Sequence, residues 1–166
     1  VATISSLTIL GQNVEVADEM NFTAPLHVKS IAPTDVVVTT TDAKANATVT
    51  VEGNLIAIEV VAEDLLTTKT YTVNVTWNLS SDATLSSITV KGKQISNFNK
   101  DTLEYNVSVK EEWSILDVEF EVSDEYATAE LSETATGVEI VVTAENGSKR
   151  IYKIKIKRSY YNEYLC

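Results

Sequence analysis

The sequence predicts an all-β protein built as two tandem immunoglobulin-like β-sandwich domains, each with about six or seven strands. Three observations lead to this prediction. Apolar and polar residues alternate over short segments, no stretch shows the 3.6-residue apolar stripe of a long helix, and the pattern occurs twice within 166 residues. Alternation places one face of a strand in a core and the other in water, so we expect half-buried strands packed in two layers.

Matching segments at the ends of the two halves reveal the repeat. Ile4–Gly11 resembles Leu85–Gly92 at an offset of 81 (85 − 4), and Tyr71–Val75 resembles Tyr152–Ile156 at the same offset (152 − 71). An offset of 81 makes Ala24 the expected counterpart of Tyr105. Two further matches lie between these segments. Ala62-Glu63-Asp64 matches Ala144-Glu145-Asn146 at an offset of 82, and Ala47-Thr48 matches Ala127-Thr128 at an offset of 80.

Strands are predicted where the alternation is regular. These segments are Leu26–Val28, Val49–Val51 and Tyr71–Trp77 in the first half, and Leu103–Val109, Val118–Val122 and Tyr152–Lys157 in the second.

Glycine and asparagine mark the predicted hairpin turns. Asn146-Gly147 predicts a type I′ turn, because both residues tolerate the positive φ that this turn needs, and Gly53-Asn54 has a similar part in the first half. The hairpin at Asp64–Thr68 is longer and exposes two leucines. Alternation breaks at Asn78–Thr84, which predicts domains over residues 1–80 and 81–158, followed by a tail at 159–166.

The second half resembles a known family. Leu85–Val90, Phe98-Asn99-Lys100-Asp101-Thr102 with the strand that follows it, and Val142–Ile154 are similar to the cadherin-like β-sandwich repeat of exported, mostly bacterial, surface proteins. The first half keeps the opening and closing strands of that pattern but lacks the Phe98–Thr102 stretch. The resemblance implies an immunoglobulin-like sandwich that accompanies other domains at the cell surface, without catalytic residues, cofactor or calcium ligands.

Charge and composition limit the classes of partner and site that we expect. The net charge is −11 and the pI about 4.5, so binding to nucleic acid is disfavoured. Cys166 is the only cysteine, which excludes an intrachain disulfide and a thiolate metal site. No apolar run reaches the length of a membrane span, so we expect no membrane insertion of these residues. We expect a monomer whose partners are neighbouring domains of a longer chain.

Catalytic and metal sites are not predicted. The only histidine, His27, lies on an outward strand position, and no serine is placed beside it. The acidic pairs (Asp18-Glu19, Glu63-Asp64, Glu111-Glu112 and Asp124-Glu125) are expected at hydrated turns, with a weak calcium site as the alternative.

A basic segment is the first candidate binding surface. Lys153, Lys155 and Lys157 alternate with apolar residues on the last strand, and they favour an acidic polysaccharide or an acidic partner. The competing interpretation is structural. Asp117, Glu119 and Glu121 form an acidic stripe, which we predict to lie beside the lysines on one sheet face, and lysines also protect an exposed sheet edge.

Two aromatic residues are the second candidate, because Trp113 in a predicted loop and Tyr126, which we expect to be exposed, could stack on a sugar ring. The alternative is that Trp113 packs in the core or anchors a loop. Trp77 is expected at the joint between the two domains.

Six Asn-X-Ser/Thr sequons occur, at Asn21, Asn46, Asn74, Asn78, Asn106 and Asn146. They predict glycosylation if the source is a secreting eukaryote, and otherwise they reflect threonine-rich strands. The expected function is a non-catalytic extracellular spacer in a longer surface or secreted protein. The alternative is a carbohydrate- or protein-binding module in an adhesin or a receptor ectodomain.

Overall fold

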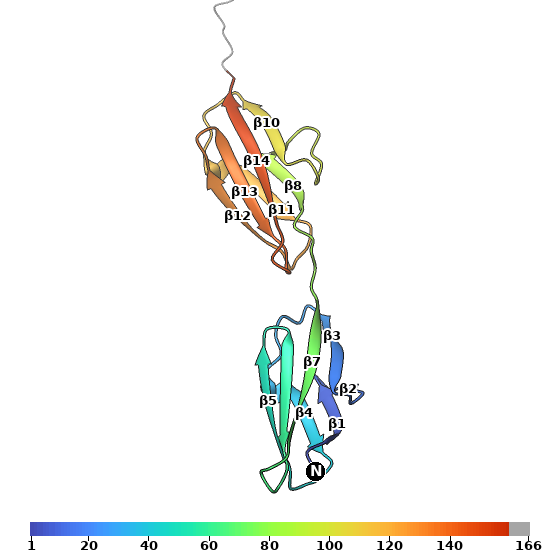
Figure 1. Cartoon of the computed structure of the whole chain (residues 1–166). Coiled ribbons are helices and arrows are strands. Elements are labelled where there is room, and N and C mark those ends of the chain that lie inside the picture. Colours follow the sequence, from blue (N-terminus) through green and yellow to red (C-terminus); the bar gives the residue numbers. More distant parts are fainter. Residues whose placement is uncertain (160–166) are drawn as a thin grey trace, which may run out of the picture. The chain divides into compact units, whose positions relative to one another are not determined.

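The structure is a computed structural model that describes residues 1–159 (Figure 1). These residues form fourteen strands and two single-turn 3-10 helices, which confirms the prediction of an all-β protein without a long helix. None of the helices is long and apolar enough to cross a membrane. The chain divides into two compact units, unit 1 over Val1–Leu79 and unit 2 from Ser80 onward.

Unit 1 has seven strands in two sheets. The three-stranded sheet has the order β2-β1-β4 and the four-stranded sheet the order β3-β7-β6-β5. The 3-10 helix η1 (Pro33–Asp35) precedes β4. The strands are β1 (Ile4–Ile9), β2 (Gln12–Val14), β3 (Glu19–Leu26), β4 (Val36–Thr40), β5 (Asn46–Glu52), β6 (Leu55–Val61) and β7 (Thr68–Asn78).

Unit 2 repeats this topology. Its three-stranded sheet has the order β11-β8-β9 and its four-stranded sheet the order β10-β14-β13-β12. The 3-10 helix η2 (Ile115–Asp117) precedes β11. The strands are β8 (Leu85–Val90), β9 (Lys93–Gln94), β10 (Glu104–Val109), β11 (Val118–Val122), β12 (Thr128–Glu133), β13 (Gly137–Thr143) and β14 (Lys149–Arg158).

Each unit has its own hydrophobic core, built from the alternation that the sequence shows. In β14 the buried side chains are Tyr152, Ile154 and Ile156, and they alternate with the exposed lysines at 153, 155 and 157. The core of unit 1 combines residues of both its sheets, for example Leu7 of β1 with Ile58 of β6. Burial on one face only is what a two-layer, sandwich-like packing requires.

A tyrosine joins the two sheets at the same place in both units. The Ile4 N–H donates to the Tyr71 hydroxyl (3.3 Å), and the Leu85 N–H donates to the Tyr152 hydroxyl (3.1 Å). Both tyrosines are almost completely buried, and both bonds join the first strand of a unit to its last. A buried hydroxyl with a backbone partner is stable where an unpaired one is costly.

The strand register corrects one predicted counterpart. Tyr105 of β10 pairs with Ile154, and Met20 of β3 pairs with Val73, which is the residue 81 before Ile154 (154 − 73). Met20, and not Ala24, is therefore the counterpart of Tyr105. The prediction was wrong because unit 2 has four more residues between β8 and β10 than unit 1 has between β1 and β3 (105 − 20 = 85, against 81).

The extra residues form a loop that two tyrosines hold in place. The Tyr105 hydroxyl accepts from the Asn99 N–H (3.0 Å) and donates to the Asn99 carbonyl (2.6 Å), while the Tyr105 ring stacks on Phe98. The Tyr152 hydroxyl donates to the Lys100 carbonyl (2.5 Å), and Arg150 pairs with Asp101 at 3.1 Å. The Phe98–Thr102 stretch is thus tied to β10 and β14.

The middle of the repeat also has a different register from the predicted one. Ala127 closes a turn onto Asp124 (2.9 Å) as Ala45 does onto Asp42 (3.0 Å), so this part of the repeat has an offset of 82 (127 − 45). The predicted match of Ala47 with Ala127 at 80 was wrong. Alanine occupies every second position there, so a match slipped by two residues keeps the same alternation.

The hairpin turns differ from prediction in one case. Gly147 has a positive φ (91°) but Asn146 does not, so this turn is not type I′. The turns with two successive positive φ values are Leu10-Gly11 and Lys91-Gly92. At Gly53-Asn54 only Gly53 has a positive φ, as a type II′ turn requires.

The longer hairpin between β6 and β7 exposes Leu65 and Leu66, as predicted.

Candidate functional site

The basic stripe lies on the outer face of the four-stranded sheet of unit 2. Lys153, Lys155 and Lys157 are exposed on β14. The strand is central, between β10 and β13, so its lysines do not protect a sheet edge as the sequence suggested.

The predicted pairing of this stripe with an acidic stripe is wrong. Glu119 and Glu121 lie on β11, which belongs to the other sheet of the unit and pairs with β8. Asp117 lies in η2, where it accepts from the Ser114 N–H (2.8 Å) and pairs with Lys91 (3.3 Å). Sequence alternation places a residue on one face of a strand, but it does not say which strands share a sheet.

The actual neighbours of the lysines differ along the stripe. Lys153 lies between Glu104 of β10 and Glu139 of β13 in the register of the sheet. Lys155 lies between Asn106 and Gly137, and Lys157 lies beside Ser108. The acidic neighbours therefore end at Lys153, and Lys155 and Lys157 form no ion pair within residues 1–159. We call Lys155 and Lys157 the cationic pair.

Each tryptophan packs against the core of the unit that contains it. Trp113 is half-buried and contacts the core of unit 2, as the alternative interpretation of this residue predicted. Trp77 is half-buried against the core of unit 1. Tyr126 is 41% exposed, and its N–H donates to Asp124 Oδ1 (2.9 Å). Trp113, Tyr126 and the lysines lie on different segments of unit 2, and none of them lines the hollows described below.

The six sequon asparagines share one property, since each side chain is exposed. Asn21 and Asn74 are direct neighbours in the parallel pairing of β3 with β7, and Asn106 lies beside Lys155. Glycan attachment needs such exposure, so the geometry is compatible with modification at these positions.

His27 does not lie on a strand. It follows β3, has a left-handed backbone (φ 67°) and is half-buried, and its N–H donates to the Asn78 carbonyl (3.2 Å). The preceding Leu26 is 65% exposed, so the predicted alternation through Leu26 and Val28 ends at this turn. No group of three His, Cys, Asp or Glu residues within 1–159 is arranged to hold a metal ion.

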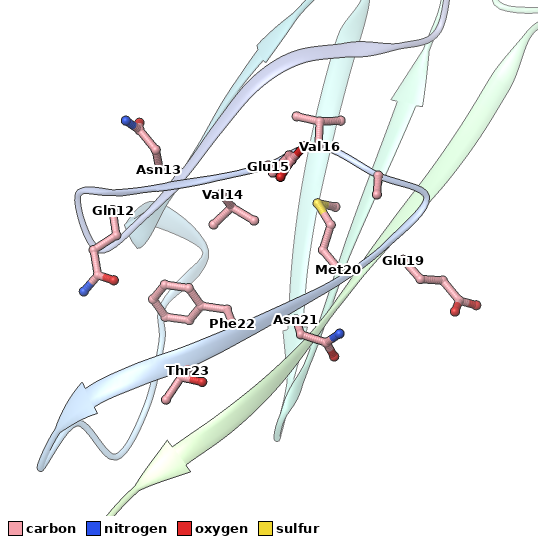
Figure 2. Close-up of a pocket in the computed structure, with 11 residues that line it drawn as sticks. Gln12, Asn13, Val14, Glu15, Val16, Glu19, Met20, Asn21, Phe22 and Thr23 are labelled. Carbon is pink, nitrogen blue, oxygen red and sulfur yellow. The ribbon is translucent and has the colours of Figure 1, made fainter.

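A shallow hollow of about 540 Å³ opens at the side of unit 1, where β2 and β3 diverge. Figure 2 shows Val14 and Val16 facing Met20 and Phe22 of β3 across it, with polar side chains such as Gln12 around the rim. Unit 2 has a smaller counterpart of about 280 Å³ between β9 and β10. These hollows are the open seams between two sheets, and core residues such as Met20 and Val90 line them together with polar side chains.

The segment that enters unit 2 is held by a polar cluster that the sequence did not predict. The Ser80 N–H donates to Glu145 Oε1 (2.8 Å), and the Ser80 hydroxyl donates to Asp124 Oδ2. The Ser80 carbonyl accepts from the Asn146 N–H (3.0 Å). Glu145 is buried although it is ionisable, which is tolerated because a backbone donor satisfies it. We call Ser80 with Asp124, Glu145 and Asn146 the linker anchor.

The residues after Ser80 continue these contacts into β8. Thr84 is buried, its N–H donates to Asp82 Oδ1 (2.9 Å), and its hydroxyl lies 2.8 Å from the Ser123 hydroxyl. The Ser123 N–H in turn donates to the Thr84 carbonyl (3.0 Å). Acidic and hydroxyl residues near a domain join are common in sequences, and only the fold shows that these meet.

Comparison with known proteins finds no matching family model and no similar curated protein.

Proposed function

We propose that the chain is a non-catalytic spacer of a longer extracellular or cell-surface protein, made of two tandem immunoglobulin-like sandwiches of the cadherin-like kind. The observation that carries the proposal is the linker anchor. A spacer transmits position only if the connection into each repeat is ordered, and Ser80 is tied to two separate loops of unit 2. The complete core of each unit supports the same proposal, because each can keep its shape without a ligand.

Backbone dynamics test the proposal directly. We expect ¹⁵N relaxation to give Ser80–Thr84 order parameters as high as those of β8, near the value of about 0.85 that is typical of rigid backbone. Glu145→Gln should lower the order parameters of Ser80 and leave those of β13 unchanged. If Ser80–Thr84 moves like a free loop in the wild-type chain, the spacer proposal loses its support.

The cationic pair favours a second function, which is the binding of an acidic polysaccharide. Lys155 and Lys157 have polar or glycine neighbours in the sheet, whereas Lys153 has two glutamates. Their positive potential is therefore less neutralised at short range.

Retention on immobilised heparin tests this second function. We expect Lys155→Gln with Lys157→Gln to elute at lower salt than Lys149→Gln with Lys153→Gln, which removes the same charge from the same strand. Equal elution of the two variants, or no retention of the wild-type chain, would exclude it.

A further inference from the structure

Unit 1 contains counterparts of the two carboxylates that bind Ser80 in unit 2. The entry strands are equivalent by their hydrogen bonds. The Thr41 N–H donates to the Thr3 carbonyl (2.9 Å), and the hydroxyls of these two threonines are 2.8 Å apart. In unit 2 the same bonds join Ser123 to Thr84, at 3.0 and 2.8 Å. Thr3 therefore corresponds to Thr84 at the offset of 81 (84 − 3).

Asp42 corresponds to Asp124. Asp42 Oδ1 accepts from the backbone N–H two residues ahead (Lys44, 3.0 Å), and Asp124 Oδ1 does the same with Tyr126 (2.9 Å). Both carboxylates are thus fixed by the same turn. In unit 2 the second oxygen, Asp124 Oδ2, accepts from the Ser80 hydroxyl.

Glu63 corresponds to Glu145. Each follows an alanine whose N–H closes the last hairpin of its unit, from Ala62 to Thr67 (2.9 Å) and from Ala144 to Ser148 (2.7 Å). Glu145 is buried under the entering segment. Glu63 is exposed and lies 3.7 Å from the Lys44 amine, a weak surface contact.

We infer that Asp42 and Glu63 form a receptor for an extended chain segment that precedes Val1. Val1 occupies the position of Asp82 (82 − 81), so the counterpart of Ser80 is two residues upstream of Val1. The receptor would take a residue with a small hydroxyl side chain and a free backbone N–H, as Ser80 has. We call Asp42 with Glu63 the upstream receptor. This inference goes beyond the proposed function, because a spacer does not require that its first unit be docked.

An extended full-length chain tests the inference. Five residues that copy 77–81 (Trp-Asn-Leu-Ser-Ser) are placed before Val1, which puts a serine at the Ser80 position. We expect the extension to slow hydrogen exchange at the core amides of Ile56 and Ile58 about fivefold to tenfold. Two charge-assisted hydrogen bonds exceed the cost of ordering the segment by about that margin.

The receptor variants provide the decisive comparison. In the extended chain, Asp42→Asn with Glu63→Gln should abolish the gain, whereas Glu52→Gln, at the other end of β5, should keep it. In the chain without the extension, the same substitutions should leave exchange at Ile56 within about twofold.

A second extension tests the chemistry of the occupant. Proline at the Ser80 position removes both the N–H and the hydroxyl, and we expect it to abolish the gain. Alanine at the Ser81 position should preserve it. The inference is overturned if the original extension leaves exchange at Ile56 unchanged, or if the gain survives loss of both receptor carboxylates. Neither result bears on the order of Ser80–Thr84, so the spacer proposal is tested separately.

Discussion

The hydroxyl groups of Tyr71 and Tyr152 occupy equivalent positions, so they form a matched pair of experiments. The Tyr152 hydroxyl accepts from the Leu85 N–H and donates to the Lys100 carbonyl, while the Tyr71 hydroxyl accepts from the Ile4 N–H. We predict that Tyr152→Phe destabilises unit 2 by about 1–2 kcal/mol, because it leaves the N–H of the buried Leu85 unpaired and removes the bond to the Lys100 carbonyl.

Urea unfolding with a probe in each unit measures this effect. Tyr71→Phe is the control, and it should destabilise unit 1 by a smaller amount and leave unit 2 unchanged. An equal effect of both substitutions on both units would contradict the separate cores. Burial raises the pKa of the Tyr152 phenol above its ordinary value of 10.0, so its contribution is present below that pH and is lost as pH rises through the raised pKa.

Asp117 gives a prediction for acid pH. The Ser114 N–H, followed by the Lys91 amine, lowers the pKa of this carboxyl below its ordinary value of 3.8. A lowered pKa contributes stability above the ordinary value, and that contribution is lost as pH falls through the lowered pKa. We therefore predict that Asp117→Asn lowers the stability of unit 2 at pH 7 and flattens its loss of stability below pH 4.

Denaturant midpoints measured between pH 7 and pH 2 check the Asp117 prediction. Glu119→Gln, two residues along on an exposed strand position, is the matched control. The same acid profile for both variants would show that the turn at Ser114 does not depend on the charge.

Single residues were the scale at which sequence reasoning was least complete. Burial of Tyr152 and exposure of Lys153 follow from alternation, but Glu145 could not be recognised as the buried partner of Ser80, which is 65 residues away. A carboxylate at a turn is normally hydrated. Glu145 is an acceptor for Ser80 only because the fold brings these two residues together. Asp117 was wrongly assigned to a strand because the alternation of apolar and polar residues begins one residue before β11 does.

At the scale of the elements, Gly137 decides how β13 approaches β14. A Cβ at this position would lie 2.0 Å from the Ile154 carbonyl oxygen and 2.9 Å from the Ile156 nitrogen. These are backbone atoms of a central strand, so they cannot move aside cheaply. We predict that Gly137→Ala destabilises unit 2 by about 3 kcal/mol, at the upper end of overpacking effects.

Gly147→Ala separates steric crowding from backbone strain. Gly147 has a positive φ of 91° but no atom near its Cβ position, so alanine there should cost about 1–2 kcal/mol. Thermal unfolding of the two variants measures the difference. If Gly137→Ala destabilises unit 2 no more than Gly147→Ala does, then β13 and β14 adjust freely at this point.

The sequence predicted the positions of strands more reliably than it predicted which strands share a sheet. The alternation of β10, β11 and β14 was visible, and each is a strand. The sheet assignment failed for β11, since no local feature of its sequence distinguishes the three-stranded from the four-stranded sheet. The reliability of the turn predictions was intermediate between these two. Gly147 was recognised, but Asn146 keeps a negative φ because the turn closes through the Gly147 N–H to Ala144 and the Ala144 N–H to Ser148.

At the scale of the whole molecule, duplication is the feature that the sequence showed most clearly. The strand order, the tyrosine bond and the 3-10 helix before the fourth strand occur in both units. The duplication did not help to identify the candidate binding residues. Trp113, Tyr126 and the lysines belong to unit 2 alone, and the fold disperses them. The residues that both units share, Asp42 with Asp124 and Glu63 with Glu145, had no motif to identify them.

The central claim is that each half of the chain closes its own core. The most direct measurement is urea unfolding of residues 1–79 and residues 80–159 expressed separately, followed by circular dichroism and by an exchange-protection map. We predict one cooperative transition for each half, with the protected amides of Ile58 and of Ile140 as in the full chain. A half that remains unfolded alone, or protection at Ile58 that needs unit 2, would contradict the claim.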